Sequence, residues 1–205
     1  MSQRGWRLLA KRALDVTVAT GLLAATAPVM AGAAAAVWAT MGRPILFRQD
    51  RVGRGDRTFR VVKFRTMSAA PAESTPEGDH LRITRVGAAL RASSVDELPQ
   101  LWNVLRGDMS LVGPRPLLVR YLPRYDTRQR RRHEVLPGLT GWAQVNGRNA
   151  LSWEEKFEHD VWYVERWSLA LDLKILARTA LQVVRRDGIS ADGHATMPEF
   201  LGRSG

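Results

Sequence analysis

Cysteine is absent from the 205-residue chain, which excludes disulfide bonds, thiolate zinc sites and cysteine nucleophiles. Acidic residues are scarce, since 20 Asp and Glu accompany 31 Lys and Arg and leave a net charge of +11. Lysine is also rare, because only four of the basic residues are lysine. Arginine binds phosphate oxygens in pairs, and basic surfaces attract anionic lipids. The composition therefore indicates a phosphorylated small molecule, a membrane surface or a nucleic acid as the partner of a single domain.

Charge is missing altogether from residues 16–42, a stretch longer than the roughly 20 residues that cross a bilayer. A secretory signal has a shorter apolar region of about 7–15 residues, whereas a buried soluble helix stays open as an alternative. Both flanks are basic, and positive charge stays on the cytoplasmic side of a membrane. Pro28 lies near the middle, where it bends or breaks a helix. We therefore favour a re-entrant helix, with its break at Pro28, over a spanning one.

The remaining chain predicts several helices together with one small β-hairpin, and therefore an α+β arrangement. Two strands are expected at residues 44–49 and 58–64, joined by a loop at 53–56. Helices are expected at 84–90, 96–105, 152–165 and 169–185, and polar segments at 68–80 and 187–205. The predicted organisation is a basic N-terminus with the membrane helix at 1–42, a main domain at 43–186 and a polar tail at 187–205.

The last predicted helix is amphipathic. Leu169, Leu173 and Leu176 share one face, while Lys174 and Arg178 lie on another. Such a helix either packs its apolar face on the core or lies in the membrane interface. Both alternatives stay open at this point.

The adjacent acids Asp96 and Glu97 lie in a basic neighbourhood that includes Arg91. Acids among arginines are commonly plain ion pairs. A carboxylate can also attack phosphorus or bind Mg²⁺ when cations neutralise the approaching phosphates. Two neighbouring acids can divide these roles.

Three further basic patterns can bind phosphate or be structural. Prolines on both sides of Arg115 reduce the entropy lost when its guanidinium binds an anion, although a rigid turn explains them equally well. Lys63 and Arg65 would share a strand face, a spacing that suits a diphosphate but is common on exposed strands. The four arginines at 128–132 are interpreted as a solvated helix.

Taken together and in order, the motifs make the chain similar to the bacterial sugar transferase family, the monotopic polyprenyl-phosphate phosphoglycosyl transferases. The resemblance covers residues 8 to 185. Its motifs are Lys11-Arg12-x-x-Asp15, Phe47-Arg48-Gln49-x-Arg51-Val52-Gly53, Lys63-Phe64-Arg65-Thr66-Met67, Asp96-Glu97-Leu98-Pro99-Gln100, Gly113-Pro114-Arg115-Pro116 and Leu136-Pro137-Gly138-Leu139-Thr140-Gly141-Trp142.

The resemblance implies transfer of sugar-1-phosphate from a UDP-sugar to polyprenyl (undecaprenyl) phosphate, with release of UMP, as the first membrane step of exopolysaccharide, O-antigen or glycoconjugate assembly. By the same resemblance Asp96 is the nucleophile and a metal ligand, Glu97 assists the metal or the lipid phosphate, and Mg²⁺ is the cofactor. Lys63, Arg65, Arg91 and Arg115 are the expected phosphate-binding residues.

The same resemblance predicts a compact, mainly helical α+β fold, with residues 43–186 as the catalytic domain. It also predicts a monotopic protein on the cytoplasmic face of the bacterial inner membrane, held by the re-entrant helix and by interfacial amphipathic helices. It implies membrane lipids as partners and no nucleic acid, and the C-terminal region offers a contact for a homodimer. Only about ten residues precede the first motif, so we expect a short-form enzyme or an excised catalytic domain. The alternative is a basic, membrane-anchored protein that binds nucleic acid or acts as a scaffold without catalysis.

Overall fold

The computed structural model describes residues 5–68, 82–147, 151–185 and 199–202. Most of the predicted segment 68–80 and of the tail 187–205 lies outside these residues. The described chain is mainly helical with small sheets, as predicted. The helices are α1 (Trp6–Met41), α2 (Arg85–Ala92), α3 (Gln100–Arg106), α4 (Thr127–Arg130), α5 (Trp142–Val145), α6 (Trp153–Arg166) and α7 (Leu169–Arg185). Shorter 3-10 turns are η1 (Arg54–Asp56), η3 (Val95–Glu97), η4 (Val119–Arg124) and η5 (Arg131–Glu134).

The predicted hairpin is present as β1 (Leu46–Val52) and β2 (Thr58–Phe64), which pair antiparallel from Leu46↔Phe64 to Val52↔Thr58. Its connection contains η1, where Gly55 has φ 63° and Asp56 φ 62°. Glycine adopts this left-handed conformation without steric cost, so Gly55 suits the turn.

A second sheet was not expected from the sequence. β3 (Ser110–Val112) and β4 (Gly138–Thr140) pair in parallel through Ser110↔Gly138 and Val112↔Thr140. Each strand has three residues, too few for an alternating pattern to be recognised. The sheet brings the two proline-containing motifs together, since the amide of Gly138 donates to the carbonyl of Pro114 at 2.9 Å.

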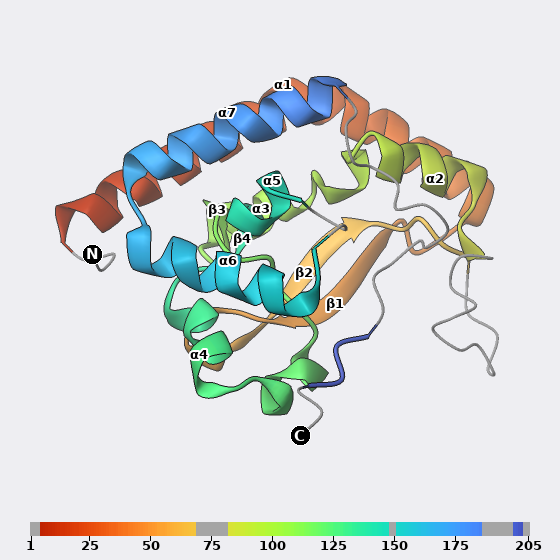
Figure 1. Ribbon diagram of the computed structural model, residues 1–205. Helices are drawn as coiled ribbons and strands as arrows, with labels where there is room; N and C mark the ends of the chain where they lie inside the picture. The colour runs from red at the N-terminus through yellow and green to blue at the C-terminus, as the bar shows by residue number, and fades with distance from the viewer. Residues whose placement is uncertain (1–4, 69–81, 148–150, 186–198, 203–205) are drawn as a thin grey trace.

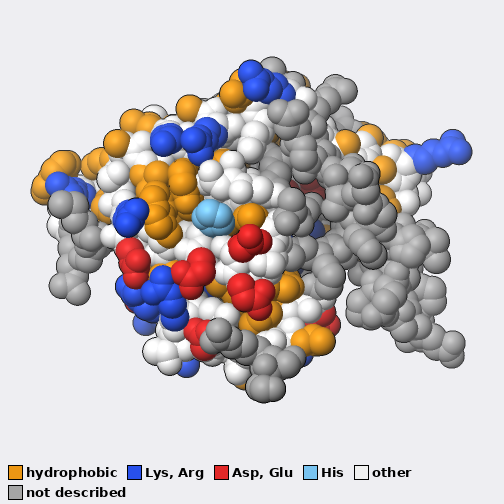
Figure 2. All heavy atoms as spheres, viewed as in Figure 1, with side chains coloured by type: hydrophobic (Ala, Val, Ile, Leu, Met, Phe, Trp, Pro, Cys, Tyr) orange, Lys and Arg blue, Asp and Glu red, His pale blue; other side chains and the backbone are white. Residues whose placement is uncertain are grey.

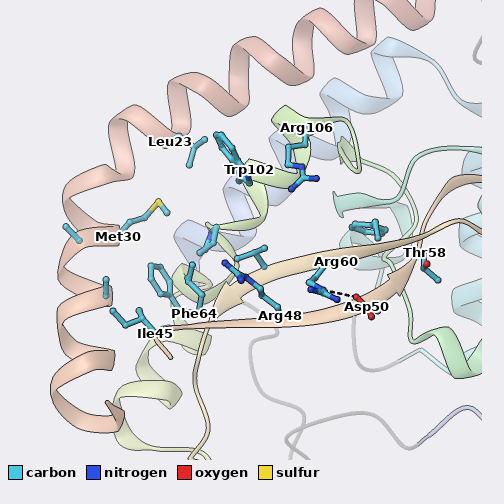
Figure 3. A pocket seen from close by; sticks show the side chains of 16 residues that line it. Leu23, Met30, Ile45, Arg48, Asp50, Thr58, Arg60, Phe64, Trp102 and Arg106 are labelled. Atoms are coloured by element: carbon cyan, nitrogen blue, oxygen red, sulfur yellow. Dashed lines mark hydrogen bonds and ion pairs between the residues drawn. The ribbon is translucent and has the colours of Figure 1, made fainter. Parts of the chain in front are cut away.

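α1 differs from the expected helix-break-helix. It is one α-helix of 36 residues that continues through Pro28, so Pro28 does not divide it into two helices. Figures 1 and 3 show α1 as an arc, bent in the part that carries Leu23 and Met30. A proline can be accommodated in this way because it removes one hydrogen bond and tilts the following turn.

Buried polar residues near the start of α1 hold this helix on the domain. Lys11 donates to Asp172 of α7 at 2.6 Å and to the carbonyl of Val112 at 3.1 Å. Asp15 accepts from the amide of Leu111 at 3.1 Å. The guanidinium of Arg12 donates to two carbonyls at the end of α3. The first motif is therefore a docking device that joins α1 to α3, β3 and α7.

α7 follows α1 along one edge of the molecule (Figure 1). Among the side chains of α7 whose burial is described, Asp172 and Ile175 are buried, whereas Leu173 is 54% exposed. The expected leucine face therefore does not simply cover the core. Figure 2 shows basic and hydrophobic side chains, and no acidic ones, along the part of α7 that faces the viewer.

Candidate active site

Asp96 and Glu97 lie in η3, a 3-10 turn between α2 and α3, rather than in the first turn of the predicted helix 96–105. Ser94 precedes this turn in the left-handed conformation, with φ 56°. The α-helix begins only after Pro99, because proline is favourable at a helix start and unfavourable inside one. The turn leaves the Asp96 side chain 6% exposed, close to the surfaces of β2 and α2.

Lys63 and Arg91 bring positive charge to this turn from two different elements. Lys63 lies near the end of β2, and Arg91 lies in the last turn of α2. The guanidinium of Arg91 donates to Thr66 at 3.0 Å. Gly87 allows α2 to approach this closely, because a Cβ there would lie 1.9 Å from the carbonyl oxygen of Thr66. Both cations favour the ionised form of Asp96.

Arg115 is presented by the loop that follows β3. The side chain is 49% exposed, and its Nη2 lies 2.5 Å from Oε1 of Glu97. The charge of Glu97 raises the pKa of Arg115 further above its already high value. Arg115 therefore lies against the acidic pair and still offers part of its guanidinium to a ligand.

The backbone of that loop is held from behind by Arg132. Nη2 of Arg132 donates to the carbonyl of Arg115 at 2.7 Å and to Asp160 of α6 at 2.7 Å. Arg132 is 2% exposed, so the interpretation of residues 128–132 as entirely solvated is wrong for this member. The other three arginines form surface ion pairs. Arg132 differs from these three arginines because it pairs with Asp160 on α6. Nothing in the sequence indicates that pairing.

Arg51 is a second basic residue that sequence reasoning did not select. It lies on β1, and its guanidinium donates to Gln49 at 2.6 Å. Burial and the neighbouring charge of Arg115 lower the pKa of Arg51 to about 10. Arg51 could have been selected from the sequence because it belongs to the motif Phe47–Gly53.

Arg65 does not join these residues. β2 ends at Phe64, so the alternation that would place Arg65 beside Lys63 stops before it. Its guanidinium donates to the carbonyls of Met41, Gly42 and Arg43 at the end of α1. The last carbonyls of a helix have no partner within it, and Arg65 satisfies them. Arg65 therefore caps the end of α1, and its contact with a phosphate stays a prediction.

The Asp96 carboxyl itself has an unusual environment. Burial raises the pKa of Asp96 to about 6, and the charge of Glu97 acts in the same direction. Lys63, Arg91 and Arg115 lower the pKa of Asp96, although less than burial and Glu97 together raise it. Burial likewise lowers the pKa of Lys63, against the opposing effects of Glu97 and Asp96. Ionised Asp96 is therefore held in a low-dielectric, cation-lined site, which is typical of functional carboxylates.

The acid pair also fits a magnesium ion. Among the described residues, none donates a hydrogen bond to the Asp96 carboxylate, whose oxygens are thus available to a ligand. No group of three or more His, Asp or Glu residues lies together in the described part of the chain. Mg²⁺ commonly takes one or two carboxylates and completes its shell with water and substrate phosphates. Asp96, together with phosphate oxygens, matches that mode.

The chain is similar to known proteins over nearly its whole length. Over residues 6–186 the chain matches the family described as bacterial sugar transferase. It is 50% identical over 196 residues to a sugar transferase named EpsL of Bacillus subtilis (strain 168), with 95% of this chain and 97% of that protein covered. It is 43% identical over 190 residues to the UDP-glucose:undecaprenyl-phosphate glucose-1-phosphate transferase of Caulobacter vibrioides, covering 87% of this chain and 71% of that protein.

A longer relative shares the same region. The UDP-N-acetylgalactosamine-undecaprenyl-phosphate N-acetylgalactosaminephosphotransferase of Aeromonas hydrophila is 39% identical over 179 residues, which are 82% of this chain and 42% of that protein. The chain therefore belongs to the bacterial sugar transferase family, and the prediction of a transferase is confirmed.

Proposed function

We propose that this chain transfers sugar-1-phosphate from a UDP-sugar to polyprenyl phosphate, undecaprenyl phosphate in bacteria, and releases UMP. The observation that carries the proposal is the buried Asp96 carboxylate, with its pKa raised to about 6, among Lys63, Arg91 and Arg115. The names of the Caulobacter and Aeromonas relatives support both the donor and the acceptor. The product would start the membrane-bound assembly of an exopolysaccharide, an O-antigen or another glycoconjugate.

The reaction proceeds in two displacements at the sugar-linked phosphorus. A carboxylate oxygen of Asp96 forms a bond to this phosphorus while the bond to the oxygen of UMP breaks, which gives an aspartyl-phosphosugar intermediate. An oxygen of polyprenyl phosphate then forms the new bond to phosphorus, and the carboxylate of Asp96 leaves. Lys63, Arg91 and Arg115 stabilise the charge that spreads over the phosphate oxygens in each step.

Glu97 and Arg115 work as a pair in this scheme. Their 2.5 Å contact orients the guanidinium towards the acidic turn, and its exposed part binds the diphosphate. When bound, Mg²⁺ held by Asp96 and phosphate oxygens would add positive charge at the phosphates. We expect Glu97 to assist the metal or the incoming lipid phosphate.

The apolar surface supports a membrane location. α1 is long and apolar enough to cross a bilayer, and only 11% of its most apolar 18-residue stretch is buried. Trp6 and Trp38, near its two ends, are 69% and 60% exposed, and tryptophan favours the membrane interface. We propose a monotopic enzyme on the cytoplasmic face of the inner membrane, with α1 re-entrant and α7 in the interface, where Leu173 meets lipid.

Intact-protein mass tests the covalent step. Wild-type enzyme incubated with UDP-sugar and Mg²⁺, without lipid, should gain the mass of one sugar phosphate on the peptide that holds Asp96. Asp96→Asn should gain none, while Glu97→Gln should still accumulate the adduct. Efficient turnover with no adduct, and kinetics that require both substrates bound together, would reduce Asp96 to a metal ligand.

UMP release across a panel of UDP-sugars, with undecaprenyl phosphate present, tests the overall reaction and identifies the sugar. Salt-dependent binding of DNA, combined with no turnover of any UDP-sugar, would instead support a nucleic-acid-binding protein.

Thiol labelling tests the topology, because the chain has no cysteine of its own. Cysteines introduced at Gln3 and Arg57 should both be shielded from a membrane-impermeant reagent in intact cells. Labelling of Gln3→Cys alone would establish a full span. Pro28→Ala should straighten α1 and move the protein towards that spanning arrangement.

A further inference from the structure

A large groove lies on the side of the hairpin away from Asp96. α1, the hairpin and α3 border an open space of about 1190 Å³ there, slightly more than the roughly 300–1,000 Å³ of typical small-molecule sites. Figure 3 shows Leu23 and Met30 projecting from the bent α1 towards this space.

The two ends of the groove differ in their chemistry. One end is apolar and is lined by Leu23, Met30, Ala31, Ala34, Ile45 and Phe64. The other end carries Arg48, Arg60 and Arg106, with Asp50 as its single acid among the lining residues. Arg60 pairs with Asp50 at 3.0 Å, whereas Arg48 forms no ion pair with any residue that the structure describes. An occupant that matches both ends has a long apolar chain and an anionic head.

The register of the hairpin separates this groove from the catalytic turn. Arg48 pairs with Val62, and Phe47 pairs with Lys63 on the following rung. Successive residues of a strand point to opposite faces of the sheet. Lys63 therefore points towards Asp96, while Arg48 and Val62 line the groove on the other face. A phosphate bound by Arg48 is on the wrong side of the hairpin to react at Asp96.

We propose that this groove binds an anionic glycerophospholipid of the bilayer, with one acyl chain along α1 and the headgroup phosphate on Arg48 and Arg60. The wall that would meet the chain belongs to the helix that is apolar enough to enter a membrane. The basic end lies on the hairpin and α3, which places it at headgroup level when α1 is in the bilayer. This lipid fills the space beneath the arc of α1 and is neither donor nor acceptor in sugar-phosphate transfer.

Lipid retention tests the proposal directly. The full chain is reconstituted in phosphatidylcholine nanodiscs with and without phosphatidylglycerol, extracted gently and examined by native mass spectrometry. We expect one phosphatidylglycerol retained in preference to phosphatidylcholine. A photoreactive phosphatidylglycerol should crosslink to peptides that contain residues 30–34 or 45–50. Equal retention of both lipids, or crosslinks only elsewhere, would overturn the proposal.

Matched arginine variants test the basic end. Arg48→Gln and Arg60→Gln should each weaken phosphatidylglycerol retention about fivefold, which corresponds to about 1 kcal/mol for one basic residue near an anionic lipid. Arg54→Gln and Arg57→Gln remove the same charge from the exposed hairpin turn and should leave retention unchanged. An equal loss in both pairs would show general electrostatic attraction and no site.

A space-filling variant tests the apolar end independently of charge. Ala31 lines the groove, whereas Ala25 is exposed on the opposite face of the same helix and does not line it. Ala31→Phe should reduce retention, and Ala25→Phe should not. Stoichiometric displacement of phosphatidylglycerol by undecaprenyl phosphate would make the groove an acceptor site and would contradict the proposal. These binding measurements are independent of turnover, so they stand even if the proposed reaction fails.

Discussion

Asp96→Asn is expected to stabilise the folded protein while it abolishes turnover. The asparagine keeps the size of the side chain and removes a charge that the fold keeps buried. Because the pKa of Asp96 is raised from 3.8 to about 6, the native state holds this proton more tightly than the unfolded chain does. At about 1.36 kcal/mol per pKa unit, ionised Asp96 costs on the order of 3 kcal/mol of stability at pH 8.

The direction in which stability changes with pH follows from the raised pKa of Asp96. Between pH 3.8 and 6 the native state binds more protons than the unfolded state, so stability falls as the pH rises through this window. The advantage of the asparagine variant should be complete at pH 8, fall to about half at pH 5 and vanish below about pH 4. For a domain of this size, 3 kcal/mol corresponds to a shift in Tm of about 6–12 °C.

Thermal unfolding in detergent at pH 8 and pH 5 measures this advantage for wild type and Asp96→Asn. Glu154→Gln is the matched control, since Glu154 is an exposed acid in the first turn of α6 and should change stability by no more than about 0.5 kcal/mol. A less stable asparagine variant at pH 8 would refute the reasoning. A gain that is equal at the two pH values would do so as well, because burial of the charge would not be its cause.

Arg115→Lys should lower turnover more than about tenfold, because a point charge cannot replace a bidentate fork; near-normal turnover would leave the motif a structural turn. Arg132→Met should lower the free energy of unfolding by about 3–5 kcal/mol, because it leaves Asp160 buried without a partner. Arg132→Met/Asp160→Leu should recover stability but not turnover, because the loop of Arg115 stays unsupported. Asp172→Ala should also cost about 3–5 kcal/mol in unfolding assays, because Lys11 is left buried without its partner; a change below 1 kcal/mol would contradict the docking role.

Local patterns were sufficient for much of the fold. Alternation and turn residues located the hairpin, and the helical patterns at 152–165 and 169–185 located α6 and α7 to within one residue of their observed starts. The capping box between Ser152 and Glu155 shows why α6 begins where it does. The β3–β4 sheet escaped prediction because its pairing joins segments far apart in the chain and rests on backbone approach at Gly113 and Gly138.

Some residues of the candidate site could likewise be predicted from the sequence, and others could not. Asp96, Glu97, Lys63, Arg91 and Arg115 could be selected from sequence, and the structure brings them together. Arg65 was selected by strand alternation, but β2 ends one residue too early for it. Arg132 was overlooked because its burial depends on Asp160, 28 residues further along the chain. A partner that only the tertiary fold brings close produces no periodic pattern in the sequence.

The contacts of the first motif connect the membrane helix to the catalytic loop. Lys11 holds the carbonyl of Val112, and Asp15 holds the amide of Leu111, on the strand that leads directly into Gly113 and Arg115. A Cβ on Gly113 would lie 2.3 Å from the carbonyl oxygen of Leu136, so this loop has little room to shift. A displacement of α1 would therefore be transmitted through β3 to Arg115. The long apolar helix α1 thus also fixes the position of a residue at the candidate active site.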